Sequence, residues 1–168
     1  SRYQLPLTPE DPVGAMRDVV QNHILQVLSL VAIEPQTGRG TDVINDRKRD
    51  VFVAMAEADP KHYVRGQYAD YRDVPGVAPD SQTETFAALR LEVENWRWAG
   101  VPFYIRAGKA MPATATGVRI VFKRPPRLGI GGRMVPDPDE LVLRIKPEPG
   151  AQLRLMSKAA GEEKLHSV

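Results

Sequence analysis

Apolar residues recur at spacings of three and four near the start of the chain, which is the pattern of an amphipathic helix with a broad buried face. Asp11 and Pro12 suit the N-cap and the first position of this helix, and the pattern stops before Pro35. The sequence therefore predicts a first helix that begins at Pro12 and ends before Pro35. Its apolar positions are Val13, Met16, Val19, Val20, Ile24, Val27, Leu28 and Val31.

A second helix is predicted from Thr41 to about Ala58. The run of charged residues at 46–50 most simply forms its solvated face. The residues expected on its buried face are Val43, Ile44, Val51 and Met55, with Phe52 as a further candidate.

After Pro60 the period of the apolar positions changes to two, which is typical of half-buried β-strands. Residues 86–98 show it best, because their odd-numbered positions are apolar up to Val93. Further strands are predicted at residues 63–68, 103–106, 118–123, 141–146 and 153–156, with a loop at 69–82 and a mobile, Pro- and Gly-rich loop at 125–140. Two helices followed by a run of strands predict an α+β fold, in which two helices pack on a mainly antiparallel β-sheet.

Composition narrows the class of protein. The chain has 168 residues, 42% of them hydrophobic and 26% charged, which is ordinary for one soluble globular domain. The net charge of +2 makes no case for a nucleic acid or a membrane as partner, and no apolar run reaches about 18 residues. There are no cysteines, which fits a reducing compartment. On these grounds we expect a cytoplasmic protein. We expect no bound metal, because no acidic or histidine cluster has metal-ligand spacing.

Residues 1–168 are predicted to form a single, partial domain. The sequence contains no G-x-G-x-x-G motif between a strand and a helix, so a Rossmann domain for a dinucleotide is absent from this chain. The glycines at 129, 131 and 132 are more simply part of a loop.

His23 and Asp18 are candidate chemical groups on the first predicted helix. His23 can exchange a proton near neutral pH and is a candidate general base; the alternative is a histidine that is hydrogen-bonded for packing. In an α-helix, five residues advance about 500° and rise about 7.5 Å, which leaves the two side chains roughly 140° apart. Asp18 is therefore not expected to orient His23. It could instead accept hydrogen bonds from a substrate hydroxyl, or be a solvated helix carboxylate.

Lys109 follows an apolar strand in the sequence Arg-Ala-Gly-Lys-Ala. An ammonium group at the end of a strand can bind a phosphate or a sugar hydroxyl, and the alternative is an ordinary surface lysine. The spacing is not that of a P-loop. Trp96 and Trp98 flank Arg97, and packing is the simpler role for them than stacking on a ligand.

Several motifs resemble the glucose-6-phosphate dehydrogenase family and occur in the family's order over about residues 11–155. They are RDVVQNH at 17–23 with the following ILQVLSLVAIEP, GQY at 66–68, TFAA at 85–88, VENWRWAGVPF at 93–103, RAGKA at 106–110 and the weaker ELVLRI at 140–145. The first and fourth motifs are long, so the resemblance is specific.

The resemblance implies a fragment of an enzyme of the pentose phosphate pathway, which oxidises glucose 6-phosphate to the lactone with NADP, or NAD in some members. It implies that His23 is the catalytic base, that Asp18 and Lys109 bind the substrate, and that the acid orienting His23 lies outside this chain. It also implies a homodimer formed through the sheet. The fragment alone is expected to bind no cofactor and to be inactive. The alternative is a non-enzymatic sheet module for dimerisation or metabolite binding.

The chain departs from the family's pattern in places. The Gly-rich phosphate turn, the upstream Asp-His-Tyr motif and most of the final strands are missing. Thr114 stands where some members carry a second basic residue near the sugar. Arg106 and Arg144 match basic positions of a second, structural NADP site in some members, but the surrounding residues are too divergent to predict that site here.

Overall fold

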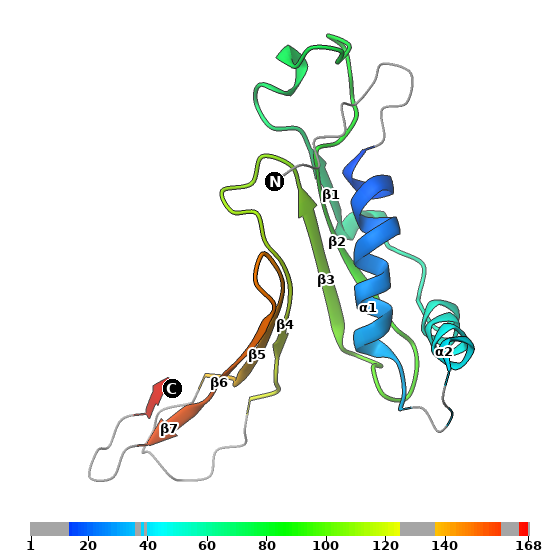
Figure 1. The fold of residues 1–168 in the computed structure, drawn as a ribbon, viewed down its shortest axis with the longest axis vertical. Helices are drawn as coiled ribbons and strands as arrows, with labels where there is room; N and C mark the ends of the chain where they lie inside the picture. The colour runs from blue at the N-terminus through cyan, green and yellow to red at the C-terminus, as the bar shows by residue number, and fades with distance from the viewer. Residues whose placement is uncertain (1–13, 36–37, 39, 125–136, 159–164, 168) are drawn as a thin grey trace. The chain divides into compact units, whose positions relative to one another are not determined.

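The computed structural model describes residues 14–35, 38, 40–124, 137–158 and 165–167. The chain forms two compact units, of which unit 1 spans Ser1–Ala110 and unit 2 spans Met111–Val168 (Figure 1). All three candidate site residues belong to unit 1.

The first predicted helix is present, and its predicted end before Pro35 is confirmed. Its first part, η1 (Met16–Ile24), is a π-helix, and it continues as the α-helix α1 (Leu25–Ala32). The backbone N–H of Leu25 donates to the carbonyl of Val20, five residues earlier, as a π-helix requires. The expectation of an α-helix throughout is therefore wrong for η1. The predicted start at Pro12 lies outside the described residues.

The second helix, α2 (Thr41–Val53), ends earlier than the predicted Ala58. The residues that follow it pair with a strand, because Met55 forms an antiparallel bridge with Val93. The backbone N–H of Ala56 donates to the carbonyl of Glu92 at 3.0 Å. Tertiary pairing thus takes the backbone groups that would have continued the helix. Two short 3₁₀ segments follow, η2 (Pro60–His62) and η3 (Tyr71–Asp73).

The sheet of unit 1 is antiparallel and has the order β1-β2-β3. Its strands are β1 (Tyr63–Gly66), β2 (Phe86–Glu92) and β3 (Pro102–Gly108). The predicted alternation in β2 is confirmed by its buried residues, which are at most 8% exposed: Ala87, Leu89, Leu91 and, just beyond the strand, Val93. The strand does not reach Trp98, because Asn95 starts a turn whose Oδ1 accepts from the N–H groups of Arg97 and Trp98.

One core joins the helices to one face of this sheet. Helix η1–α1 lies along the strands in Figure 1, and α2 packs against α1. The prediction for Val51 is confirmed, because it is only 3% exposed, whereas Ile44 was wrongly expected to be buried and is 37% exposed. The buried core residues are Ala15, Val20, Leu28, Ala32, Val51, Ala87, Leu89, Leu91, Val93, Ile105 and Ala107.

Unit 2 contains a second antiparallel sheet of β4 (Thr116–Val121), β5 (Glu140–Lys146) and β6 (Gly150–Arg154), and the pair β7 (Met156–Lys158) and β8 (Leu165–Ser167). The strands predicted at 118–123 and 141–146 are therefore found with small shifts. The strand predicted at 153–156 is shifted, because β6 starts at Gly150. Strand β8 was not predicted. Of the predicted loop 125–140, residues 125–136 lie outside the described residues.

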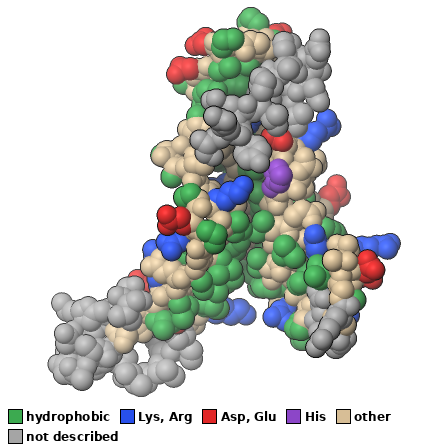
Figure 2. Space-filling view, viewed as in Figure 1, with side chains coloured by type: hydrophobic (Ala, Val, Ile, Leu, Met, Phe, Trp, Pro, Cys, Tyr) green, Lys and Arg blue, Asp and Glu red, His purple; other side chains and the backbone are tan. Residues whose placement is uncertain are grey.

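The second sheet leaves apolar surface open in unit 2. Val121 and Leu153 are 52% and 53% exposed, and Figure 2 shows hydrophobic side chains gathered over these strands. With two helices and antiparallel sheets, the predicted α+β fold class is confirmed. In the part of the chain that the structure describes, no helix is long and apolar enough to cross a membrane.

Candidate functional site

Asp18 and His23 lie on one face of the π-helix η1. In an α-helix the hydrogen-bonded positions i and i+4 share a face, and in a π-helix the hydrogen-bonded positions are i and i+5. Asp18 and His23 are five residues apart inside η1. Their side chains are therefore one turn apart on the same side. Asp18 is partly buried, whereas His23 is exposed.

The π-helix changes the angle expected between the side chains of Asp18 and His23. The angle of about 140° between them assumed α-helical geometry, and the structure has a π-helix at this point. Helix geometry thus no longer excludes an interaction between Asp18 and His23. Among the described residues, no hydrogen bond or ion pair joins them.

Lys109 follows directly after the last residue of β3. Its backbone N–H donates to the carbonyl of Thr85 at 2.8 Å, which continues the pairing of β3 with β2 by one residue. Ala110 then adopts a positive φ of 54°, so the chain turns away from the sheet at this point. The strand end thus fixes the backbone of Lys109, and the side chain is partly buried.

Glu84 and Thr85 connect the helix to the end of β3, which Lys109 directly follows. The carbonyl of Glu84 accepts from the N–H of Ala15 at 2.9 Å, and the Glu84 carboxylate accepts from the N–H of Met16 at 3.2 Å. The next residue, Thr85, accepts from Lys109. Two consecutive residues therefore hold the start of η1 beside the end of β3, at one end of the sheet (Figure 1). Sequence reasoning missed Glu84, because no local pattern marks a partner 68 residues away.

The other end of the helix is held by Trp98. Its indole N–H donates to the carbonyl of Ala32 at 2.9 Å, and its ring packs edge-on against Phe103. Arg97 forms an ion pair with Glu34 at 3.2 Å. The prediction of a packing role is confirmed for Trp98. Trp96 is 89% exposed and does not share this role.

The electrostatic effect of Glu84 extends to two tyrosines of unit 1. Burial raises the pKa of Tyr63, and the Glu84 carboxylate raises it further, against the opposing effect of Arg65. Burial is also the main cause of the raised pKa of Tyr71, with smaller contributions from Tyr68 and Glu84 and an opposing hydrogen bond to Ser81. In the described ranges, no group of three acidic, histidine or cysteine side chains could hold a metal ion.

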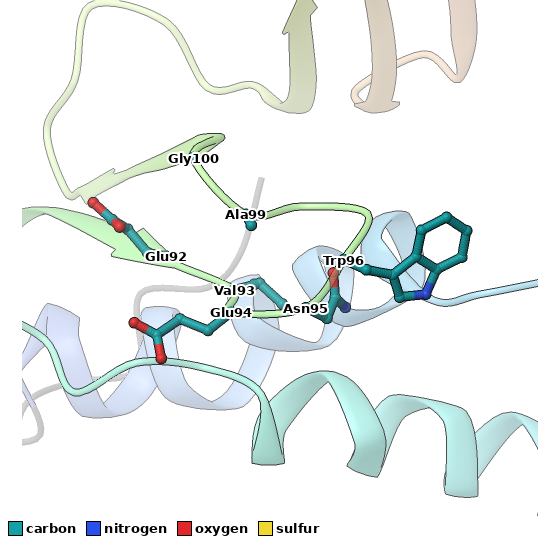
Figure 3. A pocket seen from close by; sticks show the side chains of 7 residues that line it. All are labelled: Glu92, Val93, Glu94, Asn95, Trp96, Ala99 and Gly100. Carbon is teal, nitrogen blue, oxygen red and sulfur yellow. The ribbon is translucent and has the colours of Figure 1, made fainter.

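A pocket lies at the turn between β2 and β3, away from the candidate residues. Its lining residues are Glu92, Val93, Glu94, Asn95, Trp96, Ala99 and Gly100. Glu92 pairs with Pro102 at the start of β3, whereas Lys109 follows its end. Figure 3 shows that the side chains of Glu92, Glu94 and Trp96 point in different directions. None of the predicted site residues lines this pocket.

In fold the chain is similar to the C-terminal part of sugar-phosphate dehydrogenases. Residues 10–168 match the family described as "Glucose-6-phosphate dehydrogenase, C-terminal domain". The chain belongs to this family, and the resemblance seen in the motifs is confirmed.

Individual relatives support the same assignment. Glucose-6-phosphate 1-dehydrogenase 1 of Mycobacterium tuberculosis (strain ATCC 25618 / H37Rv) is 55% identical over 146 residues, which are 86% of this chain and 31% of the relative. The Bacillus subtilis (strain 168) enzyme is 42% identical over 164 residues, 88% of this chain and 33% of the relative. The chain thus spans about a third of the length of these relatives.

Two solved structures share the fold. A glucose-6-phosphate 1-dehydrogenase from Mycobacterium avium matches with a TM-score of 0.85 and 54% identity, covering 93% of this chain and 34% of the other. A glucose-6-phosphate dehydrogenase in complex with its substrate glucose 6-phosphate matches with a TM-score of 0.84 and 34% identity, with the same coverage of both chains.

Proposed function

We propose that this chain is part of the substrate domain of a glucose-6-phosphate 1-dehydrogenase. The complete protein would oxidise glucose 6-phosphate to 6-phosphogluconolactone with NADP, as a step of the pentose phosphate pathway. The names of the relatives support this proposal, as does the similarity to a structure described with glucose 6-phosphate bound.

The observation that carries the proposal is the arrangement at one end of unit 1. Asp18 and His23 share a face of η1, and Lys109 is tied by Thr85 to the segment that also holds the start of this helix. A carboxylate, an imidazole and an ammonium group are thereby presented by two rigid elements. Within the described residues, no hydrogen bond or ion pair occupies these three side chains, so they are available to a ligand.

Each group suits one part of a sugar phosphate. His23 is exposed and would accept the proton of the C1 hydroxyl as the sugar is oxidised, in the role of general base. Asp18, one turn earlier, would accept hydrogen bonds from sugar hydroxyls. The Lys109 ammonium would donate to a sugar hydroxyl or to the phosphate. Rigid placement of such groups lowers the entropy cost of reaching the reactive geometry.

The described residues do not fit a dinucleotide site of the usual kind. Their sheets are antiparallel throughout, whereas a Rossmann unit needs parallel strands and a phosphate-binding turn before a helix. We therefore assign NADP to the part of the complete protein outside this chain. The fragment alone would then be inactive.

We also propose that the complete protein is a cytoplasmic homodimer assembled through its sheet. Exposed apolar side chains of the second sheet, including Val121 and Leu153, support a surface that is covered in the assembly. Light scattering of the complete protein tests the dimer. A monomer at micromolar concentration would overturn this part of the proposal.

The experiment that tests the proposed activity compares the complete protein with the 168-residue chain. The complete protein should reduce NADP with glucose 6-phosphate and not with unphosphorylated glucose at the same concentration. The isolated chain should not reduce NADP under either condition. A complete protein that leaves glucose 6-phosphate unchanged would overturn the proposal.

A further inference from the structure

Glu84 contacts the first turn of the π-helix with both its backbone and its side chain. The carbonyl accepts from Ala15, and the carboxylate Oε1 accepts from Met16. These N–H groups belong to the start of a helix, where the donors have no partner within the helix itself. A carboxylate at this position also interacts favourably with the positive end of the helix dipole. Glu84 therefore caps the helix from a distant segment.

Gly14 provides the room for this cap. A Cβ atom added at Gly14 would lie 2.3 Å from Glu84 Oε1 and 2.5 Å from its carboxyl carbon. The carboxylate therefore packs directly on the backbone before the helix. The carbonyl of Gly14 in turn accepts from the N–H of Asp18 at 2.9 Å. Gly14, on which the Glu84 carboxylate packs, is thus hydrogen-bonded directly to Asp18, the candidate substrate-binding residue.

Thr85 fixes the backbone next to Glu84 against the sheet. Its side chain is almost fully buried, at 1% exposure, and its Oγ1 accepts from the N–H of Tyr68 at 3.0 Å. Its backbone N–H donates to Gly66 and its carbonyl accepts from Lys109. The backbone on which Glu84 sits is therefore fixed to β1 and to the end of β3.

We propose that Glu84 is a positioning residue of the substrate site. Its carboxylate fixes the height and rotation of the π-helix against the sheet, and so sets Asp18 and His23 relative to Lys109. This inference rests on the proposed function, because it needs a reaction that depends on these three residues. A displacement of about 1 Å at reacting groups can cost about a hundredfold in rate. Loss of the cap should therefore lower kcat/KM by more than the accompanying loss of folding stability would explain.

The test uses the complete enzyme with the substitution E84A and the conservative substitution E84Q. E84A should lower kcat/KM for glucose 6-phosphate by about tenfold or more, with a lower kcat at saturating substrate. E84Q keeps an amide oxygen that can accept from Met16, and it should recover most of the activity. Unchanged kcat/KM in E84A would overturn the proposal.

W98F is the matched control for a purely structural role. It removes the hydrogen bond to Ala32 at the opposite end of the same helix and leaves the start of η1 untouched. Both variants should lower the melting temperature, but W98F should keep kcat/KM within about twofold of the original enzyme. If E84A and W98F lose activity in proportion to their loss of stability, Glu84 has a structural role only and the proposal fails.

G14A disturbs the same contact from the other side and remains informative if E84A does not fold. The added methyl group must displace the Glu84 carboxylate, so kcat/KM should fall as in E84A. Where both single variants fold, the double variant should lose no more than the worse of the two, because both act on one contact. Normal activity in G14A, or full additivity, would contradict the positioning role.

The variant H23N distinguishes failure of the positioning role of Glu84 from failure of the proposed function. If H23N retains full activity, the proposed chemistry is wrong whatever Glu84 does. If H23N is inactive while E84A is fully active, the chemistry stands and only the positioning role of Glu84 falls.

Discussion

Asp18 lies one helical turn before His23 on the same face of the π-helix Met16–Ile24. Five positions separate the two residues, and this spacing places side chains on one face only where the backbone hydrogen bonds run from i to i+5. π-Helical turns occur often at functional sites. The local winding of the helix therefore has a direct consequence, because it places a carboxylate and an imidazole on the same face.

Replacing Asp18 by Asn tests the substrate-binding role of this carboxylate. The amide keeps the size of the side chain but loses the charge and half of its acceptor capacity. A hydrogen bond to a charged group contributes about 1.5–3 kcal/mol, so D18N should raise KM for glucose 6-phosphate by about tenfold or more. Asp42, on the exposed start of α2, provides the control D42N, which should leave KM unchanged. Equal KM values in D18N and the original enzyme would refute the role of Asp18.

The core under the helix gives a prediction for stability. Leu91 is 5% exposed and belongs to the cluster that joins the helix to the sheet. Truncation of a buried leucine to alanine costs about 2–5 kcal/mol in unfolding free energy, which urea denaturation of the complete enzyme can measure. V53A, at a position that is 78% exposed, should change the unfolding free energy by less than about 0.5 kcal/mol. Similar small losses in both variants would show that this cluster is not the core.

Tyr71 gives a prediction for the alkaline range. Its pKa is raised in the folded protein, mainly by burial, so above pH about 10 the unfolded chain loses the phenol proton more readily than the native one. The contribution of Tyr71 to stability is thus fully present below that pH and lost as pH rises.

The measurement is the unfolding free energy at pH about 8 and about 10.5. Y71F removes the ionisable group, so its stability should decline less over this interval than that of the original protein. Y104F, at a side chain that is 76% exposed, controls for the general loss of a phenol. A steeper decline in Y71F than in the original protein would show that the sign of this pKa effect is wrong.

The sequence predicts those features that depend on local periodicity. The period of two identifies the buried face of β2, because Leu89 and Leu91 must both face the core. The spacing of three and four identifies the first helix, but it does not distinguish α- from π-helical hydrogen bonding, and so it misjudged the angle between Asp18 and His23.

Features that depend on distant contacts were not predictable in this way. Helix α2 ends early because Met55 pairs with Val93, although the residues after Val53 continue a helical pattern. Glu84 caps a helix 68 residues away in sequence, and no local pattern marks it. Sequence motifs identified the candidate residues themselves. Only the folded structure shows how these residues are arranged relative to one another.

We propose His23 as the base of the reaction, and the turnover of H23N in the complete enzyme is the measurement that decides this role. Asn preserves the polarity of the site but cannot accept the hydroxyl proton near neutral pH. If His23 is the base, kcat should fall by about 10²–10⁴-fold while KM for glucose 6-phosphate stays within a few-fold. A kcat within about threefold of the original enzyme would contradict it, and the base would then have to be sought outside η1.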